Sequence, residues 1–324
     1  MVRLLVFLWL ACLPGFAQLP VIFDTDMGND VDDALALAML HALENRGECK
    51  LIGVTLTNAH PDAVPFIHMM NRFYGRPSIP VGAAMATVKG GANPGFLTPA
   101  LEAAPARLRI MNRMATPPAV VLLRSLLAES AGKVAIVQVG FSTNLAALLD
   151  SPADAISPLS GRELIRQKVG ILSVMAGNFE AATPEYNVKQ DIPPAKKLFE
   201  NWPGSIVFSG FEIGMRLPYP ATSIKADYNY VPWHPVVASY HAYKKFPYDR
   251  PTWDLTSVLA AVRPNHGYFT LSAPGKVTVD AATGATTFRG STQGNRVHLQ
   301  IPPGGEARIL EALTLLSSEP PKPR

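Results

Sequence analysis

The sequence is poor in cysteine, with only Cys12 and Cys49 among 324 residues. Cys12 lies in an N-terminal segment that we expect to be cleaved off, so the mature chain keeps Cys49 alone and forms no intrachain disulfide. No histidine or aspartate pattern surrounds Cys49, which favours a structural role for its thiol. A chain without disulfides has to be held together by its core or by a bound ion.

The sequence also lacks a large excess of one charge, since 29 basic and 25 acidic residues leave a formal net charge of +4. The basic residues are scattered, so we expect no nucleic-acid partner. There is no Walker motif and no Gly-x-Gly-x-x-Gly after a strand, which argues against a phosphate-binding loop. Beyond the N-terminus, no apolar run reaches the length of a transmembrane helix.

The first 17 residues have the pattern of a secretory signal peptide. Arg3 provides a positive start, residues 4–13 form a short apolar run, and Gly15-Phe16-Ala17 offers small residues for cleavage before Gln18. We therefore expect an exported protein, periplasmic or secreted, with no membrane attachment after residues 1–17 are removed. A membrane anchor that stays attached is the alternative.

Short apolar runs alternate with helical segments along most of the remaining chain. The expected strands are residues 20–23, 51–56, 79–82, 134–139, 169–175 and 205–208. The expected helices are residues 31–43, 62–74, 117–129, 143–149, 194–200, 236–246 and 255–262. This alternation predicts an α/β fold, in which a mostly parallel, Rossmann-like open sheet is flanked by helices.

The C-terminal region departs from this alternation at residues 276–289. Val277 and Val279 alternate with polar residues, and an Ala-Thr-Gly turn follows, so we expect a small β-hairpin. No internal repeat or long linker divides the chain. We therefore predict one catalytic domain over residues 18–316 and a disordered tail over residues 317–324.

The most informative segment is acidic and lies between a predicted strand and a predicted helix. It contains Asp24, Asp26, Asp30, Asp32 and Asp33. Open α/β sheets build their sites at the carboxyl ends of their strands, and converging carboxylates repel unless solvent or a cation compensates them. Oxygen ligands without nearby cysteine or histidine suit a hard ion, calcium before magnesium. Helix capping explains one or two of these aspartates but not five.

The segment from Asp24 to Leu35 resembles the N-terminal signature of the inosine–uridine-preferring nucleoside hydrolases. Later segments resemble family motifs in the right order, so the resemblance extends from Val21 to about Pro264. They are Asn58 after the second strand, Gly140-Phe141-Ser142-Thr143-Asn144, Gly177-Asn178 followed by Glu185-Tyr186-Asn187, and Trp253-Asp254. One such motif is weak evidence, whereas five in order are specific. The resemblance implies a nucleoside hydrolase-like fold.

It also implies an activity, namely hydrolysis of the N-glycosidic bond of a ribonucleoside or related ribosyl compound by a calcium-activated water. The calcium ligands would be Asp26, Asp33, the backbone carbonyl of Thr143, and Asp254. Asp26 would also act in catalysis, by accepting the proton of the attacking water. The ribose would be hydrogen-bonded by Asp32, Asn58, Asn178, Glu185 and Asn187. Relatives commonly form dimers or tetramers, which implies a homo-oligomer.

The physical logic agrees with these roles. Breaking an N-glycosidic bond develops positive charge on the sugar, which surrounding carboxylates stabilise, while a metal ion lowers the pKa of the attacking water. A site that satisfies every sugar hydroxyl should reject deoxyribose, because its polar partners would be left unpaired.

The sequence departs from the family pattern at two places. Two extra residues follow Gly28, and we align Asp32 and Asp33 with the family pair because the apolar helix begins directly after them, leaving Asp30 as a further candidate. In addition, Trp253 replaces the histidine linked to leaving-group protonation, and its ring can stack on a base but cannot supply a proton. The base preference and the leaving-group acid therefore stay open. The segment that could reach the base contains His234, His241, Tyr228, Tyr230 and Tyr243.

Two alternative functions remain at this point. In a phosphatase of the haloacid dehalogenase type, Asp24 would be the nucleophile and Asp26 the acid/base, with magnesium; Gly28 then stands where threonine or valine is expected. In a non-catalytic protein on the nucleoside hydrolase scaffold, the site would only bind ribosyl compounds, and the replacement of the histidine by Trp253 motivates this alternative.

Overall fold

The structure, a computed structural model, describes residues 18–58, 60–85, 95–109, 116–181 and 183–322. The predicted signal segment, residues 1–17, lies outside these ranges, so its removal stays a prediction. Within the described ranges, no helix combines the length and the apolar character that crossing a membrane requires.

A single large sheet forms the centre of the molecule, and its main part is parallel. The strand order is β11-β10-β12-β6-β5-β4-β1-β2-β3, and β9 pairs with β12. The strands are β1 (Leu19–Thr25), β2 (Cys49–Leu56), β3 (Val81–Ala83), β4 (Val134–Gln138), β5 (Val169–Met175), β6 (Ile206–Ser209), β9 (Thr270–Leu271), β10 (Gly275–Val279), β11 (Thr286–Gly290) and β12 (Arg296–Gln300). All neighbours from β12 to β3 pair in parallel, which confirms the predicted fold class.

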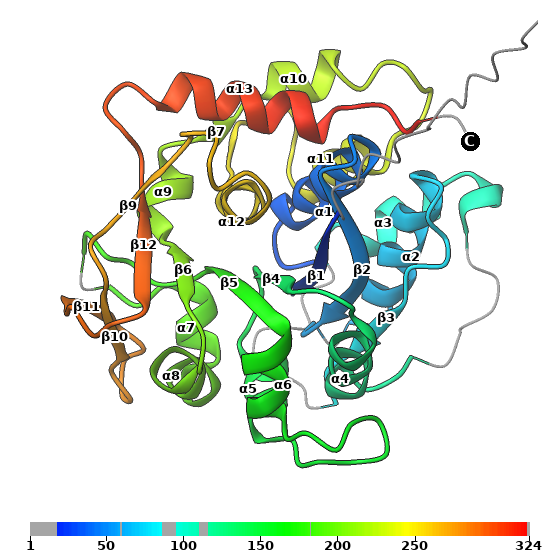
Figure 1. The fold of residues 1–324 in the computed structure, drawn as a ribbon. Coiled ribbons are helices and arrows are strands. Elements are labelled where there is room, and N and C mark those ends of the chain that lie inside the picture. The colour runs from blue at the N-terminus through cyan, green and yellow to red at the C-terminus, as the bar shows by residue number, and fades with distance from the viewer. Residues whose placement is uncertain (1–17, 59, 86–94, 110–115, 182, 323–324) are drawn as a thin grey trace, which may run out of the picture.

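Helices cover both faces of this sheet. They are α1 (Asp32–Asn45), α2 (Ala63–Phe73), α3 (Leu97–Glu102), α4 (Ala119–Glu129), α5 (Thr143–Asp150), α6 (Gly161–Lys168), α7 (Tyr186–Gln190), α8 (Ile192–Asn201), α9 (Phe211–Met215), α10 (Ala221–Ala226), α11 (Pro235–Tyr243), α12 (Trp253–Val262) and α13 (Glu306–Ser317). Figure 1 shows α1, α12 and α13 on one face, and α4, α5, α6 and α8 on the other. Two short segments complete the described elements: the 3₁₀ helix η1 (Ala106–Leu108), and the ribbon of β7 (Pro218–Tyr219) with β8 (Arg250–Pro251).

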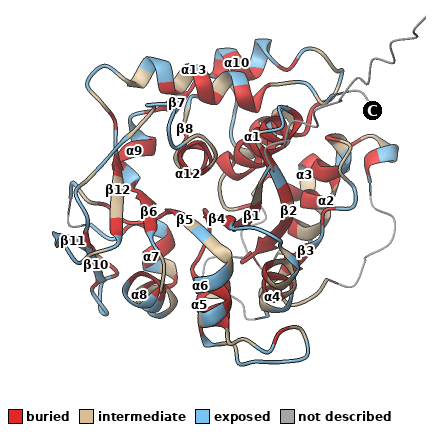
Figure 2. Ribbon diagram, in the orientation of Figure 1, coloured by how far each residue is buried: buried red, intermediate tan, exposed pale blue. Residues whose placement is uncertain are grey.

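The core is divided by the sheet into two layers. Successive residues of a strand point to opposite faces, so Val21 and Phe23 of β1 pack in the layer of α1 and α12, while Ile22 packs in the layer of α4 and α5. Every residue of α1 is buried, as Figure 2 shows, because the helix lies between the sheet and helices α12 and α13. Its first turn therefore carries Asp32 and Asp33 into the interior at the carboxyl end of β1.

The C-terminal hairpin is present as β10 and β11 with antiparallel pairing, as the sequence predicts. It continues the main sheet, since Gly275 of β10 pairs with Arg296 of β12. The structure ends α13 at Ser317, inside the segment predicted to be a disordered tail, and residues 318–322 are described beyond it. Glu319 forms an ion pair with Arg46 at 2.5 Å, which holds this segment near α1.

Candidate active site

A cavity of about 360 Å³ opens at the carboxyl ends of the central strands, where open α/β sheets place their ligands. Residues from the β1–α1 loop and the first turn of α1, the ends of β4, β5 and α11, the ribbon strand β8, and the starts of α7, α9 and α12 line it. They are Asp26, Asn29, Asp30, Asp32, Asp33, Val139, Met175, Glu185, Tyr186, Asn187, Phe211, Tyr243, Arg250, Trp253 and Asp254. One side of this cavity is acidic and the other is aromatic.

The β1–α1 loop brings its aspartates into the cavity through a sharp turn at Gly28. Gly28 has a φ of +117°, and a Cβ there would lie 2.5 Å from Cδ1 of Leu97. Asn58 holds the turn, because its Nδ2 donates to the backbone carbonyls of Asp26 at 3.3 Å and Met27 at 3.0 Å. Asn58 supports the loop, and the structure does not place it among the residues that line the cavity.

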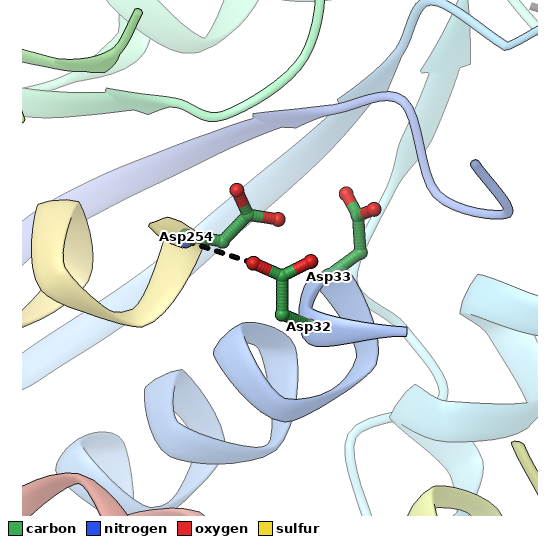
Figure 3. A group of neighbouring side chains, drawn as sticks. All are labelled: Asp32, Asp33 and Asp254. Atoms are coloured by element: carbon green, nitrogen blue, oxygen red, sulfur yellow. Dashed lines mark hydrogen bonds between the residues drawn. The ribbon is translucent and has the colours of Figure 1, made fainter. Parts of the chain in front are cut away.

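The acidic side of the cavity is built around Asp32, Asp33 and Asp254, whose ligand atoms lie within 4.8 Å of one another. Figure 3 shows them meeting where the N-termini of α1 and α12 face each other. The backbone N–H of Asp254 donates to Oδ2 of Asp32 at 3.1 Å, and the hydroxyl of Thr25 donates to Oδ1 of Asp33. Helix N-termini favour negative charge, so both helices stabilise these carboxylates in part.

Electrostatics show that this cluster is short of positive charge. Burial raises the pKa of Asp33 and Asp254 well above the usual value, and the neighbouring carboxylates raise both further. Burial likewise raises the pKa of Asp26 to about 6. Buried carboxylates with oxygen-only surroundings and raised pKa values are the donor set that a divalent cation such as calcium stabilises. The residues present therefore fit a metal ion.

Asp26 faces the cavity beside this cluster. Its Oδ2 accepts a hydrogen bond of 2.5 Å from Nδ2 of Asn29, in the lengthened segment after Gly28. Asp30, in the same segment, forms a two-point ion pair with Arg250, in which Nε lies 2.9 Å from Oδ1. The lengthened segment thus positions the Asp26 carboxylate and adds an ion pair to the cavity wall.

Glu185 and Asn187 line the opposite edge of the acidic side. Glu185 caps α7 and accepts backbone N–H groups from Gly177, Asn187 and Val188, at 2.8 to 3.3 Å. Burial raises the pKa of Glu185 to about 7, although the three hydrogen bonds to backbone N–H groups act to lower it. Nδ2 of Asn187 donates to the carbonyls of Val139 at 2.9 Å and Met175 at 3.2 Å. Both side chains are thereby fixed in place, as residues that grip a sugar need to be.

Two further predicted site residues, besides Asn58, are not among those that line the cavity. Nδ2 of Asn178 donates to the Thr183 hydroxyl at 2.9 Å, so its side chain closes a local turn. The hydroxyl of Thr143 donates to Asp191 at 2.9 Å, and the residue directly after β4 that lines the cavity is Val139. A carbonyl ligand from this strand end is therefore better placed at Val139.

Asp24, the nucleophile of the phosphatase alternative, is fully buried and does not line the cavity. Its Oδ1 accepts hydrogen bonds from Thr55 at 2.5 Å and Asn144 at 2.8 Å, which tie β1 to β2 and α5. Burial raises its pKa to about 7. A substrate phosphate in the cavity would not meet this carboxylate, so the geometry argues against a phosphatase that uses Asp24.

Aromatic rings form the other side of the cavity. Trp253 stacks on Phe211 with ring centroids 5.5 Å apart, and its Nε1 donates to the Phe211 carbonyl at 3.0 Å. Tyr243 lines the cavity too, the one member to do so of the five residues in the segment predicted to reach the base. Flat aromatic faces are surfaces on which a planar base can stack, and the stacking role of Trp253 stays a prediction.

Several cavity residues had no predicted role. They are Asn29, Val139, Met175, Tyr186, Phe211 and Arg250. Tyr186 stands between Glu185 and Asn187 in the quoted motif, so its position could have been inferred, and Phe211 follows a predicted strand. No sequence signal marks Arg250, because its partner Asp30 is 220 residues away.

Gly140, at the turn after β4, has to be glycine for the cavity to form. A Cβ there would lie 2.4 Å from the backbone nitrogen of Asp26 and 2.7 Å from the carbonyl carbon of Thr25. We expect Gly140→Ala to lower the free energy of unfolding by about 1–3 kcal/mol, since backbone has to shift. Displacing Asp26 by about 1 Å would also lower the catalytic rate, by roughly 10²-fold.

Thermal unfolding and the rate of base release measure the two effects of this substitution. Gly132→Ala is the matched control, since a Cβ at Gly132 has no heavy atom within 4 Å. Equal melting temperatures and equal rates for the two variants would contradict the close contact between the turns after β1 and β4.

A family model described as inosine-uridine preferring nucleoside hydrolase matches residues 21–310. No curated protein matches the chain. Among solved structures, the plant nucleoside hydrolase PpNRh1 superposes with a TM-score of 0.72 at 21% identity, covering 93% of this chain and 99% of that chain. The inosine-uridine preferring nucleoside hydrolase of Bacillus anthracis gives 0.72 at 16% identity, with 93% and 99% covered.

A third solved structure is the type III effector protein XopQ complexed with adenosine diphosphate ribose. It gives a TM-score of 0.70 at 15% identity, with 94% of each chain covered. At these identities the structures establish a shared fold, while the family model spans most of the sequence. The chain belongs to the inosine-uridine preferring nucleoside hydrolase family, a family of N-ribohydrolases.

Proposed function

We propose that the protein hydrolyses the N-glycosidic bond of ribonucleosides, with water as the nucleophile and a calcium ion at the carboxylate cluster. The observation that carries this proposal is one cavity with two chemically different sides. Carboxylate and amide oxygens that can accept from sugar hydroxyls line one side, and stacked rings that fit a base line the other. The scissile bond would lie between them.

The acidic side would bind and orient the ribose. Asp32 and Asn187 offer oxygen acceptors in the cavity, while their hydrogen bonds to Asp254 and Val139 keep them in place. As the bond to the base breaks, positive charge develops on the sugar, and the surrounding carboxylates stabilise it. Their preorganisation by backbone contacts lowers the cost of aligning sugar and water.

Asp26, Asp33 and Asp254 would hold the metal ion, and the carbonyl of Val139, a residue of the cavity lining, would be the backbone ligand. A bound divalent cation supplies the charge that lets water lose a proton near neutral pH and that aligns neighbouring hydroxyls. Asp26, held by Asn29, would accept that proton. Calcium is the ion we propose, because the donors are several carboxylates and no nitrogen or sulfur.

A non-catalytic ribosyl-binding protein is the second candidate, and Trp253 favours it. Nε1 of Trp253 is already bonded to the Phe211 carbonyl, so this side chain offers no donor to a leaving base. The neighbouring effector structure is one that holds adenosine diphosphate ribose. Binding of ribosyl compounds without base release would support this candidate.

The test is release of free base and reducing sugar from a panel of purine and pyrimidine ribonucleosides, before and after treatment with chelator. We expect turnover of at least one ribonucleoside, a loss of about 100-fold or more in chelator, and recovery with Ca²⁺. Turnover that persists in chelator would remove the metal from the proposal. No turnover of any nucleoside by the metal-loaded protein would contradict the enzyme itself.

We also propose export, on the pattern of residues 1–17. The intact mass of the protein purified from outside the cytoplasm should equal that of a chain that begins at Gln18. A mass that includes the first 17 residues would contradict cleavage at this point.

A further inference from the structure

Arg250 is the one basic side chain among the described residues that line the cavity. It comes from β8, three residues before Trp253, and lies on the aromatic side. Its carbon Cζ stands 5.0 Å from the ring centroid of Trp253 and 5.5 Å from that of Tyr243. A cation therefore lies where the base would stack, although the sequence has Trp253 in place of the family's histidine.

The orientation of this guanidinium is fixed. Its Nε and Nη2 both donate to the carboxylate of Asp30, and its Cζ lies over the rings of Tyr243 and Trp253. Within the described residues, Nη1 donates no hydrogen bond, so its two N–H groups are left for a ligand, together with the second N–H of Nη2. A guanidinium held by these contacts loses little conformational freedom when it binds a ligand.

The partner of Arg250 belongs to the segment after Gly28 that is lengthened by two residues. Asp30 reaches across 220 positions of sequence to make this pair. The chain thus departs from the family pattern twice, at the insertion and at Trp253, and the two departures meet in one place: the ion pair lies against the Trp253 ring. This coincidence suggests that one compensates for the other.

We propose that Arg250 is the catalytic residue that stabilises the departing base, and this role rests on the proposed function. As the bond between C1′ and the base nitrogen breaks, its electron pair moves to the base, and the oxygen of water bonds to C1′. Nη1 donates a hydrogen bond to the base as negative charge develops on it. Arginine keeps its own proton, so the proton that finally neutralises the base comes from solvent, while the proton lost by the attacking water passes to Asp26 and from there to solvent.

The substrate class follows from this role. The base must be planar, to stack beside Trp253, and must carry an acceptor nitrogen or oxygen that gains electron density on departure. Bases of ordinary ribonucleosides meet both conditions. A riboside whose leaving group is stable as an anion, such as 4-nitrophenolate, needs no such help.

The test compares inosine with 4-nitrophenyl β-D-ribofuranoside as substrates of the full metal-loaded protein. The variant is the double substitution Arg250→Met with Asp30→Asn, which removes the cation without leaving an unpaired carboxylate. We expect kcat/KM for inosine to fall by about 10²- to 10³-fold and that for the nitrophenyl riboside by less than about tenfold. The loss for inosine should appear in kcat, because the developing charge exists only in the transition state.

The matched control is Arg216→Met with Glu306→Gln, an ion pair of half-exposed side chains outside the cavity, which should change neither substrate. Equal losses on both substrates, or an unchanged rate on inosine, would overturn the role of Arg250. If the unmodified protein cleaves neither riboside, the proposed function fails instead. Thermal unfolding of both double variants shows whether they are folded.

Discussion

Asp33→Asn should reduce kcat/KM for a ribonucleoside by at least about 10²- to 10³-fold, the range found when one preorganised electrostatic group is removed. The asparagine keeps an oxygen that can accept from the Thr25 hydroxyl, so the local hydrogen bond survives. What is lost is one negative charge at the point where Asp32, Asp33 and Asp254 meet. The assay is release of reducing sugar at saturating Ca²⁺.

The stability of the same variant separates a metal ligand from a structural residue. In chelator, Asp33→Asn should melt no lower than the unmodified protein, because it relieves repulsion among buried carboxylates. Calcium should stabilise the unmodified protein by about 2.7 kcal/mol at 100 times its Kd and the variant by much less. A variant that melts lower in chelator, yet responds to Ca²⁺ like the unmodified protein, would contradict ligation by Asp33.

Asp24→Asn is the matched control, taken from the same acidic segment. Oδ1 of Asp24 accepts from both Thr55 and Asn144, and an asparagine oxygen can keep these bonds. Since Asp24 does not line the cavity, we expect activity within about tenfold of the unmodified protein, in line with a change outside the reacting groups. Complete loss of activity in this variant would contradict the position of Asp24 outside the reacting groups.

The central fold could be predicted from the sequence because its strands are buried on both faces. Such strands are continuous apolar runs, and β5 has the expected bounds, while β1, β2 and β4 differ by up to two residues at either end. The elements that were missed have weaker patterns. β12 lies next to an edge hairpin and has only two buried positions, Arg296 and Leu299, so it is not a continuous apolar run. α13 follows β12 after the loop Pro302–Gly305, so the missing strand also hides the strand–helix alternation at this point.

Site residues could be predicted where the identity of the side chain itself indicates a role. They could not be predicted where the role belongs to a backbone group or depends on a partner distant in sequence. Asp33 and Asp254 meet as the resemblance implies. The backbone ligand near the end of β4 is different, because every residue has a carbonyl and its position cannot be read from residue type. The resemblance implies Thr143 as this ligand, whereas the residue that lines the cavity is Val139. Asn58 shows a third case, since its amide binds backbone carbonyls that only the folded loop brings near it.

A 2′-deoxyribonucleoside should be a poor substrate, with kcat/KM about 10⁴-fold below that of the matching ribonucleoside. The reason is that the acidic side of the cavity consists of buried acceptors, among them Asp32, and is complete only when hydroxyls donate to them. Removing one hydroxyl leaves a desolvated acceptor without a donor, which costs more than the lost hydrogen bond itself. The aromatic side, which binds the base, is the same for both substrates.

The comparison should use inosine and 2′-deoxyinosine, each as a substrate and as a competitive inhibitor. Asp32→Asn should shrink the ratio between them, because its effect falls on the substrate that has the hydroxyl. Asp62→Asn is the control: this carboxylate accepts from Thr98 at 2.6 Å outside the cavity, and its replacement should leave the ratio unchanged. Discrimination of less than about tenfold would mean that these carboxylates do not grip the sugar, because a site built on its hydroxyls cannot accept their loss so easily.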